Sequence, residues 1–374
     1  MSMLALPSIR DEAWRWADTG AITRAAALAR STTVIPPFLE LAGSRLVFVD
    51  GVYDPHRSAP GRVQVAALGL ASDHALGARA GATGWSLALG TAEVETGIQI
   101  VHVSTGGENH LGGRIVLGEG AVVSVVETYV GTGWANRLTQ IELARSARLQ
   151  RAVRLLQADG FVSLRDEIAV GQGASHVTTV LGAGGMGARA DAAITLTGDA
   201  AYAEMGGALL TRGSQRQECA VAVRHAAPHG VSHQTWRAVA ADRSVASLAA
   251  RVEVARDAQK TDGEQSLRGI LLDRTATVNL KPELEIFADD VKCAHGATVG
   301  ELDARALFYL ASRGIDPARA KALLTRAFVA DALARIGDET VRAAFVADAD
   351  AWLEAALSSP SRLREGLGEG VSDG

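Results

Sequence analysis

The sequence predicts a mainly β protein in which a strand-rich centre lies between an N-terminal helical region and a C-terminal helical domain. From about residue 97, short runs with period-two alternation follow one another, each ended by Gly, Asp or Asn. No helical segment long enough for a βαβ crossover separates them. Glycine accounts for 40 of 374 residues, whereas aromatic residues make up only 5%. The strands fit a sandwich, a barrel or a β-solenoid, and the glycine content favours the solenoid, although no clean repeat period is visible.

Composition excludes several classes of protein. Hydrophobic residues (48%) and charged residues (21%) are near the globular norm, so the chain is not disordered as a whole. The net charge of -5 argues against nucleic-acid binding, and no charge-free apolar stretch of about 18 residues predicts a membrane span. Two cysteines cannot form a disulfide framework, and the N-terminus has the features of neither a secretory signal nor a transit peptide. We expect a soluble protein of the reducing cytoplasm.

The first 96 residues predict a helical or mixed region. Residues 8–30 combine a serine cap, early acidic residues and a strongly helix-forming end, so a helix is expected there. Two prolines at 36 and 37 end it. Residues 45–54 predict two strands joined by a turn at Asp50-Gly51. The Ala-rich residues 68–95 predict helix or loop.

Three helical segments follow the strand-rich centre. Gly314 and Gly337 act as C-terminal stops, and Asp316-Pro317 is an N-cap followed by a first-turn proline. We therefore divide the chain into four parts. These are a helical or mixed region (1–96), a β core (97–298), a helical domain (299–357) and a disordered tail rich in Gly, Ser and Glu (358–374).

Two motifs match functional patterns but fit structural roles better. Residues 182–187 (GAGGMG) satisfy the dinucleotide pattern G-x-G-x-x-G, yet strand-like alternation rather than a helix follows them, which favours a tight turn between strands. His225, His229 and His233 have the spacing of a metal-binding helix face. A proline and a glycine between them predict a loop instead, with the histidines pointing in different directions.

Cys293 and His295 lie at the junction between the strands and the helices. Two residues apart on a strand, they share one face, because side chains alternate. Thiolate and imidazole are ligands for iron–sulfur species, zinc or copper. Two ligands make an incomplete site, since such metals take about four. The pair therefore either borrows ligands from a partner or is one buried cysteine and one structural histidine, and spacing alone favours the second interpretation.

Several segments resemble the SufB/SufD family, whose members are subunits of the SufBCD scaffold for iron–sulfur cluster assembly. They include KPELEIFADDVKCAHGATVGELD (281–303), ALFYLASRGI (306–315), ARAKALLTRAF (318–328), HAAPHGVS (225–232) and LPSIRDEAWRWAD near the N-terminus. The chain resembles SufD rather than SufB, because Gly296 stands where SufB has a glutamate and only two cysteines are present.

The resemblance implies a central right-handed β-helix between an N-terminal helical region and a C-terminal helical domain. It also implies a non-catalytic scaffold subunit that pairs with SufB, works with sulfur-delivery proteins and binds a SufC ATPase; a homodimer can form without SufB. His295 and Cys293 would lie at the SufB interface and support the nascent cluster as transient metal ligands shared with the partner. No stable cofactor is expected on the chain alone, and binding of a reduced flavin by the complex stays open.

We expect the helices after Glu301 to cover the end of the solenoid with part of their apolar surface and to dock the ATPase with the rest. The side chains assigned to docking are Phe308, Leu323, Leu324 and Phe328, with Arg319 and Lys321 as exposed charges.

Two alternatives stay open. A stand-alone β-solenoid enzyme that binds metal or carbohydrate would need a ladder of carboxylates or basic residues. Only Asp166-Glu167 stands out in the strand-rich centre, and we interpret that pair as an exposed strand end. An inert interaction module would carry the Cys-x-His pair without any chemistry.

Overall fold

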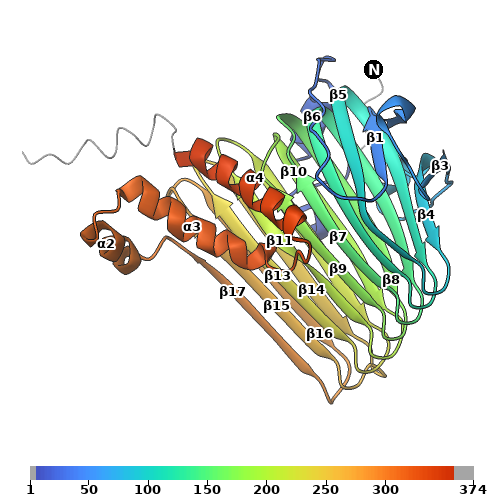
Figure 1. Ribbon diagram of the computed structural model, residues 1–374. Helices are drawn as coiled ribbons and strands as arrows, with labels where there is room; N and C mark the ends of the chain where they lie inside the picture. Colours follow the sequence, from blue (N-terminus) through green and yellow to red (C-terminus); the bar gives the residue numbers. More distant parts are fainter. Residues whose placement is uncertain (1–5, 358–374) are drawn as a thin grey trace, which may run out of the picture.

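A parallel β-solenoid forms the centre of the computed structural model, which describes residues 6–357 (Figure 1). Its strands are β5 Val94–Leu117, β6 Val122–Leu143, β7 Arg148–Leu155, β8 Asp159–Val170, β9 Ser175–Gly182, β10 Gly187–Leu196, β11 Tyr202–Thr211, β12 Arg216–His225, β13 Val231–Ala240, β14 Val245–Val254, β15 Asp262–Leu271, β16 Thr277–Ile286 and β17 Lys292–Gly300. The even-numbered strands from β6 to β16 pair in parallel in one sheet, and the odd-numbered strands from β7 to β17 pair in the other. The predicted solenoid is confirmed.

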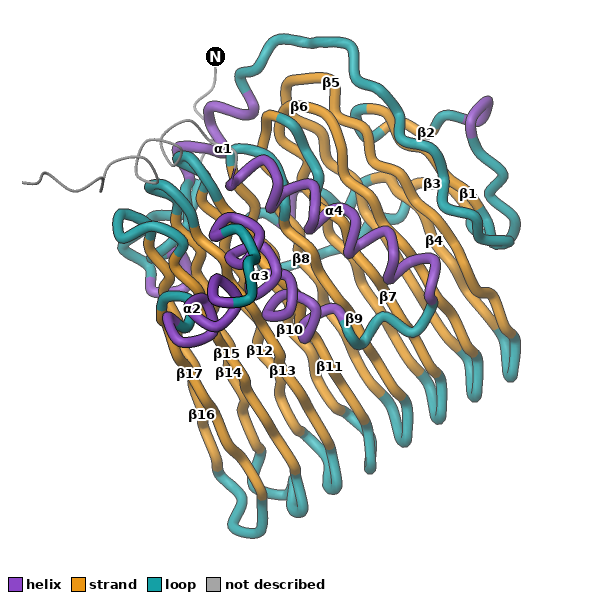
Figure 2. The backbone as a smooth tube through the Cα atoms, turned by 60° about the vertical axis from the view of Figure 1, so that its left-hand side comes forward, coloured by secondary structure: helices purple, strands orange, loops and turns teal. Residues whose placement is uncertain are grey.

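The length of a turn varies along the solenoid. In one sheet Gly187 pairs with Arg216 and Arg216 with Val245, a step of 29 residues each time. In the other sheet Arg148 pairs with Ser175, a step of 27 residues. Because the loops between strands differ in length, as Figure 2 shows at the lower edge of the stack, the sequence carries no fixed period.

The strands β5 and β6 are 24 and 22 residues long because each passes through both sheets. The first part of β6 pairs with β7 and its second part with β8. The bend falls at Gly131 and Gly133, whose φ angles are +95° and +101°. A Cβ on Gly133 would lie 2.6 Å from the carbonyl oxygen of Gly107. Only glycine combines that φ with so close an approach of two backbones.

The solenoid begins before residue 97. Strands β1 (Arg45–Val49) and β4 (Thr83–Leu89) both pair in parallel with β5. Between them lie the short strands β2 (Val52–Tyr53) and β3 (Gln64–Ala67). The predicted turn is confirmed, with positive φ at Asp50 and Gly51. The prediction of helix or loop over residues 68–95 is wrong for β4, where the side chains of Trp85, Leu87 and Leu89 alternate into the core.

The helix expected over residues 8–30 is wrong in extent. The chain forms a single 3-10 turn at Glu12–Trp14 and then the helix α1 at Thr19–Ala26. The break falls before Asp18, whose carboxylate accepts a hydrogen bond from the amide of Ala21 at 2.8 Å and starts α1 as an N-cap. Packing of Trp14 against the solenoid, described below, outweighs the local helix propensity and determines the conformation of this segment.

Three C-terminal helices are confirmed: α2 (Ala304–Ser312), α3 (Pro317–Leu333) and α4 (Glu339–Leu357). They do not cover the end of the solenoid as expected. Figure 1 shows α3 and α4 lying across the outer face of the sheet that contains β11 and β13. Phe345 and Trp352 of α4 belong to an apolar cluster with outward-facing side chains of that sheet, such as Leu181 and Val239.

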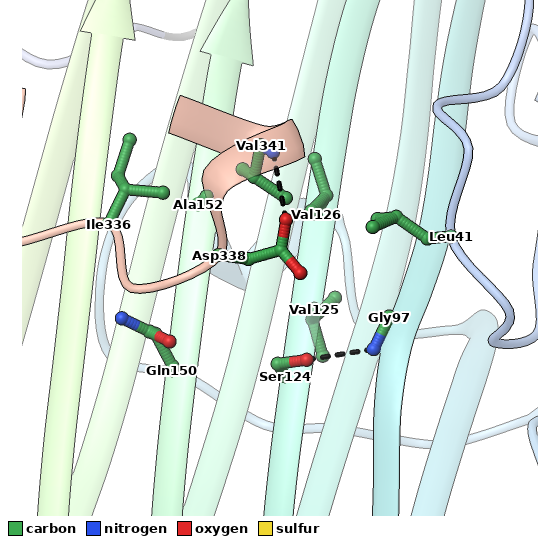
Figure 3. A pocket seen from close by; sticks show the side chains of 10 residues that line it. All are labelled: Leu41, Gly97, Ser124, Val125, Val126, Gln150, Ala152, Ile336, Asp338 and Val341. Atoms are coloured by element: carbon green, nitrogen blue, oxygen red, sulfur yellow. Dashed lines mark hydrogen bonds between the residues drawn. The ribbon is translucent and has the colours of Figure 1, made fainter. Parts of the chain in front are cut away.

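Polar contacts fix the helices on this face. Arg154 of β7 donates from both Nε and Nη2 to the carboxylate of Asp348 in α4, at 2.6 and 2.9 Å. A small pocket lies where the loop before α4 meets the sheet (Figure 3). There Asp338 accepts from the amide of Val341 at 3.0 Å and caps α4. The helices are therefore a lateral support for the solenoid, and its end is left open.

The tail predicted as disordered, residues 358–374, lies outside the described residues. Within residues 6–357, no helix is both long and apolar enough to cross a membrane.

Candidate functional site

The solenoid ends in an uncovered turn formed by β16 and β17. Strand β16 pairs only with β14, and β17 pairs only with β15, among the described residues. Each strand therefore presents one edge of unpaired backbone groups. The interior of this turn is open as well. Leu280 and Leu284 of β16 are only partly buried, and Val299 of β17 is 44% exposed.

Cys293 and His295 lie on the inner face of β17. Cys293 packs against the main apolar core of the solenoid. His295 is two residues further along the same strand, so it shares that face, and it is exposed. In the previous turn the equivalent positions are Gly263 and Gln265, and Gln265 is only 1% exposed. The two side chains would thus be interior residues if the solenoid continued by another turn.

The thiol of Cys293 is half-buried. Burial raises its pKa, partly opposed by a backbone hydrogen bond from Gly263. Cys219, the second cysteine, is fully buried in the core, and burial raises its pKa well above the usual value. Cys293 is consequently the accessible thiol of the two. It becomes a thiolate ligand only when a metal or a base displaces its proton.

Space around the pair is open on the side of Gly296. A Cβ on Gly296 would meet no atom within 4 Å. Asp290, three residues before Cys293, does not complete a ligand set. Its backbone carbonyl accepts from the amide of Lys260 at 2.6 Å, and its carboxylate pairs with the same lysine. Across the described chain, no group of three or more His, Cys, Asp or Glu side chains could hold a metal ion. Cys293 and His295 are two ligands of an incomplete site.

The structure separates the three histidines: His225 ends β12, His233 lies in β13, and only His229 lies in the predicted loop between them. His225 bonds Ser232 at 2.8 Å through Nε2, His229 bonds Asp199 at 2.7 Å through Nδ1, and His233 faces Glu264 at 3.5 Å. The structural interpretation is confirmed. Residues 182–187 likewise form the turn between β9 and β10, where a Cβ on Gly184 would lie 2.4 Å from a backbone carbonyl oxygen.

The residues assigned to ATPase docking do not all share one exposed surface. Phe308 on α2 is 76% exposed and Leu323 on α3 is 36% exposed. Arg319 and Lys321 are exposed too, and Leu324 is partly buried. Phe328 is different: it packs against the cluster between α3 and the sheet, with the Arg237 guanidinium 5.8 Å from its ring centre.

A charged cluster that the sequence analysis missed lies inside the solenoid. Arg151 of β7 donates to Glu127 at 2.6 Å and to Asp166 at 2.5 Å, and all three side chains are at most 2% exposed. Glu127 also bonds His102 at 3.2 Å and the hydroxyl of Tyr129 at 2.7 Å. The interpretation of Asp166 as an exposed strand end is wrong. The alternation Leu164-Asp166-Ile168 places it on the inward face of β8, and that parity was the available signal.

Burial and charge pairing set the protonation states of this cluster. Burial would raise the pKa of Glu127, but Arg151 and His102 outweigh it and hold that pKa well below its usual range. Burial raises the pKa of Asp166 despite the same guanidinium. Burial also lowers the pKa of His102 to about 4, with Glu127 opposing the shift. The imidazole is therefore neutral at physiological pH.

A second charged cluster lies outside, beneath the N-terminal segment. Arg189 of β10 donates to Asp191 at 2.6 and 2.8 Å and to Glu218 at 2.6 Å. Its guanidinium lies 4.0 Å from the ring centre of Trp14 and donates to the carbonyl of Ala13. Burial raises the pKa of Glu218 to about 7, partly opposed by Arg189. A groove of about 510 Å³ runs along this face beside the segment.

Most of the chain, including the open turn, falls within a match to a known family. The family described as "SUF system FeS cluster assembly, SufBD core domain" matches residues 78–328. The chain belongs to the SufB/SufD family. That match covers β4 through most of α3, and so includes the whole run from β5 to the open turn. The resemblance inferred from the motifs is thereby confirmed.

Relatives place the chain on the SufD side of the SufB/SufD family. It is 28% identical to the iron-sulfur cluster assembly protein SufD of Escherichia coli over 255 residues, 65% of this chain and 60% of the relative. A SufBD family protein of Synechocystis is 40% identical over 116 residues, 31% of this chain and 25% of the relative. The chloroplastic protein ABCI7 of Arabidopsis thaliana is 27% identical over 61% of this chain and 50% of its own length. The matched region thus spans at most about 60% of these relatives.

Proposed function

We propose that this chain is a non-catalytic scaffold subunit for iron–sulfur cluster assembly and that its open terminal turn is half of the assembly site. A SufB-type subunit would cover the turn and supply the remaining ligands. One observation carries the proposal: two ligand-type side chains, Cys293 and His295, face the interior of a turn whose two strands each pair with only one other described strand. The iron and sulfide are cargo here, and cytoplasmic work with sulfur-delivery proteins is part of the proposal.

Physical reasons support a partner at this position. Unpaired edges of β16 and β17 can be extended by strands of a second chain, which satisfies their backbone groups. Burying Leu280, Leu284 and Val299 adds apolar contact at about 25 cal/mol per Å². Inside such an interface the half-buried thiol of Cys293 and the imidazole of His295 leave bulk water, and partner side chains complete a coordination shell of about four. A second copy of this chain is the substitute occupant when the partner is missing.

The decisive experiment uses the full chain co-purified with its SufB-type and SufC-type partners. His295→Ala should leave complex assembly intact and sharply reduce iron and acid-labile sulfide per complex. His229→Ala, an exposed histidine in a loop, is the matched control and should change neither. Cys293→Ser should lower the content as much as His295→Ala if the thiol is a ligand, and less if it only supports the site. Normal cluster content in His295→Ala would refute the proposal.

Alkylation of Cys293 tests the interface separately from the chemistry. A thiol reagent should label this half-buried cysteine in the free chain and leave the buried Cys219 unmodified. Assembly with the SufB-type partner should protect Cys293. Equal labelling in the free chain and the complex would place the interface elsewhere.

We further propose that α2 and the exposed side of α3 dock the ATPase subunit, to which any ATP hydrolysis would belong. Phe308 and Tyr309 are 76% and 57% exposed side by side on α2, and Arg319 and Lys321 lie in the first turns of α3. Phe328 is left out of this surface, because it packs between α3 and the solenoid.

Substitutions test docking better than truncation, because removing residues 301–374 would also uncover the outer face of the sheet. Phe308→Glu, or the pair Arg319→Glu and Lys321→Glu, should weaken co-purification of the ATPase without unfolding the chain. Ile9→Glu, at an apolar residue that is 59% exposed near the N-terminus, is the control. Unchanged recovery of the ATPase with all three docking substitutions would exclude this surface.

The interior carboxylates do not support the alternative of a stand-alone solenoid enzyme. The inward carboxylates Glu127 and Asp166 are paired with Arg151 and closed off from solvent, so they offer no open catalytic pair. An inert module would give normal cluster content in His295→Ala, which the first experiment detects.

A further inference from the structure

A short column of glutamines leads through the interior toward His295. Gln234 of β13 and Gln265 of β15 are neighbours in register, and both are at most 1% exposed. Each side chain crosses the interior to the next strand in the sequence. Nε2 of Gln234 donates to the carbonyl of Arg251 in β14 at 3.1 Å, and Nε2 of Gln265 donates to the carbonyl of Glu283 in β16 at 3.2 Å.

His295 is the next member of this column. Parallel pairing of β15 with β17 places His295 directly beside Gln265, and neighbouring strands lie about 4.8 Å apart. The column stops there because β17 is the last strand of the solenoid. Unlike the glutamines, His295 has no following strand to reach within residues 6–357.

Gln265 has an unused acceptor. Its Oε1 is buried and, like Oε1 of Gln234, has no hydrogen-bond partner among the described residues, whereas its Nε2 donates to the carbonyl of Glu283. That bond fixes the amide orientation, since Nε2 must be the atom that faces the carbonyl. Leaving a buried polar atom without a partner is unfavourable, so a donor at this position is strongly favoured. The imidazole N–H of His295 lies on the adjacent strand.

We propose that Gln265 is a positioning residue for His295, with Oε1 accepting a hydrogen bond from one imidazole N–H. This bond selects one tautomer and holds the ring across the open turn. The second ring nitrogen, unprotonated in the neutral imidazole, is then directed away from the chain's own backbone and toward the partner side. The use of that nitrogen as an iron ligand rests on the proposed function, whereas the hydrogen bond itself does not.

The first test reads the tautomer directly. In the full chain with ¹⁵N-labelled histidine, His295 signals are assigned by their loss in His295→Ala, and the two ring-nitrogen shifts are measured at a pH where the ring is neutral. We expect one dominant tautomer in the wild type. Gln265→Leu should give the mixture of an unconstrained imidazole. Gln234→Leu loses the same kind of cross-interior bond one turn deeper and should leave the His295 tautomer unchanged.

The outcomes separate this inference from the proposed function. A tautomer ratio in Gln265→Leu equal to that of the wild type would overturn the positioning role, for instance because a buried water satisfies Oε1. If Gln265→Leu does not fold, Gln265→Met, which has a similar length and no amide, replaces it, and a wild-type tautomer ratio in that variant overturns the role instead. In the purified complex, loss of an orienting partner should weaken iron retention about 10- to 100-fold, as is typical for such residues. Normal cluster content in His295→Ala with an intact tautomer effect would refute the function alone.

Discussion

Arg151 and Glu127 form an ion pair at 2.6 Å inside the solenoid, and both side chains are at most 1% exposed. The pair is not isolated, because the same guanidinium also bonds Asp166. Replacing Arg151 removes the cation that these two carboxylates share. The consequences for stability are large because a buried charge without a counter-charge is costly.

Arg151→Leu should therefore lower the free energy of unfolding by about 3–5 kcal/mol. Urea unfolding followed by circular dichroism measures it. The matched control is Arg114→Leu, which breaks an exposed pair with Glu142 and should cost about 0–1 kcal/mol. Equal effects of the two substitutions would show that the interior pair is not a desolvated one.

Buried neutral histidines predict a loss of stability in acid. Burial lowers the pKa of His225 to about 4, with Asp262 opposing the shift, and burial followed by Arg151 lowers that of His176 to about 3. An unfolded histidine titrates near 6.5. The unfolded chain thus binds more protons than the folded chain between pH 6.5 and 4. As the pH falls through that window, each such histidine lowers the free energy of unfolding by about 1.4 kcal/mol per pH unit.

His225→Gln should keep a polar partner for Ser232 and remove one of the groups that take up a proton on unfolding. Its free energy of unfolding should fall less steeply with pH between 6.5 and 4 than that of the wild type, by about one proton. Above pH 6.5 the two curves should run parallel. A variant curve that stays parallel to the wild type down to pH 4 would contradict a lowered pKa for His225.

Glu218 predicts the opposite pH dependence. Its folded pKa of about 7 lies above the unfolded value of 4.5, so folding favours the protonated form. Stability from this group is present below pH 4.5 and is lost as the pH rises through 7. Glu218→Gln should stabilise the chain by about 1–3 kcal/mol at pH 8 and have little effect at pH 4.5. Urea midpoints at the two pH values test this, and a loss of stability at pH 8 would show that the ion pair with Arg189 dominates.

The bend in β6 makes a steric prediction. Gly133→Ala places a Cβ 2.6 Å from the carbonyl oxygen of Gly107 at a φ of +101°, and should destabilise the chain by several kcal/mol. Gly107→Ala also has a positive φ but meets no atom within 4 Å, so it should cost only about 1 kcal/mol. Thermal unfolding of both variants compares them. Similar melting temperatures would mean that the bend relaxes around the methyl group.

The predictable parts of the fold are those set by local chemistry. Asp50 and Gly51 are residue types that favour a tight turn, and both adopt positive φ there. Asp316 caps α3, and Pro317 fixes φ at its first position. The strand β4 is not predicted from the sequence, because Ala and Gly are frequent around it and hide the alternation. Its pairing with β5 determines its conformation. Helix propensity over 8–30 likewise yielded to the packing of Trp14 on Arg189.

The candidate site was predictable only in part. Alternation placed Cys293 and His295 on one face of a strand. Whether that face is interior, and that the turn is uncovered, depends on pairing with β15 from an earlier turn. Asp166 shows the same limit: its charge suggested solvent, while its parity with Leu164 and Ile168 turned it inward. The position of α3 and α4 on the side of the solenoid depends on the outward residues of several strands together.

The interior charges also guard against misfolding. Successive turns of a solenoid present similar sheets, so a strand can add to the stack one whole turn out of place without breaking its alternation. Arg151, Glu127 and Asp166 come from three consecutive strands, β7, β6 and β8. A stack shifted by one turn would separate the guanidinium from its carboxylates and trap a bare charge in an apolar interior. The cluster therefore disfavours a stack that is shifted by one turn.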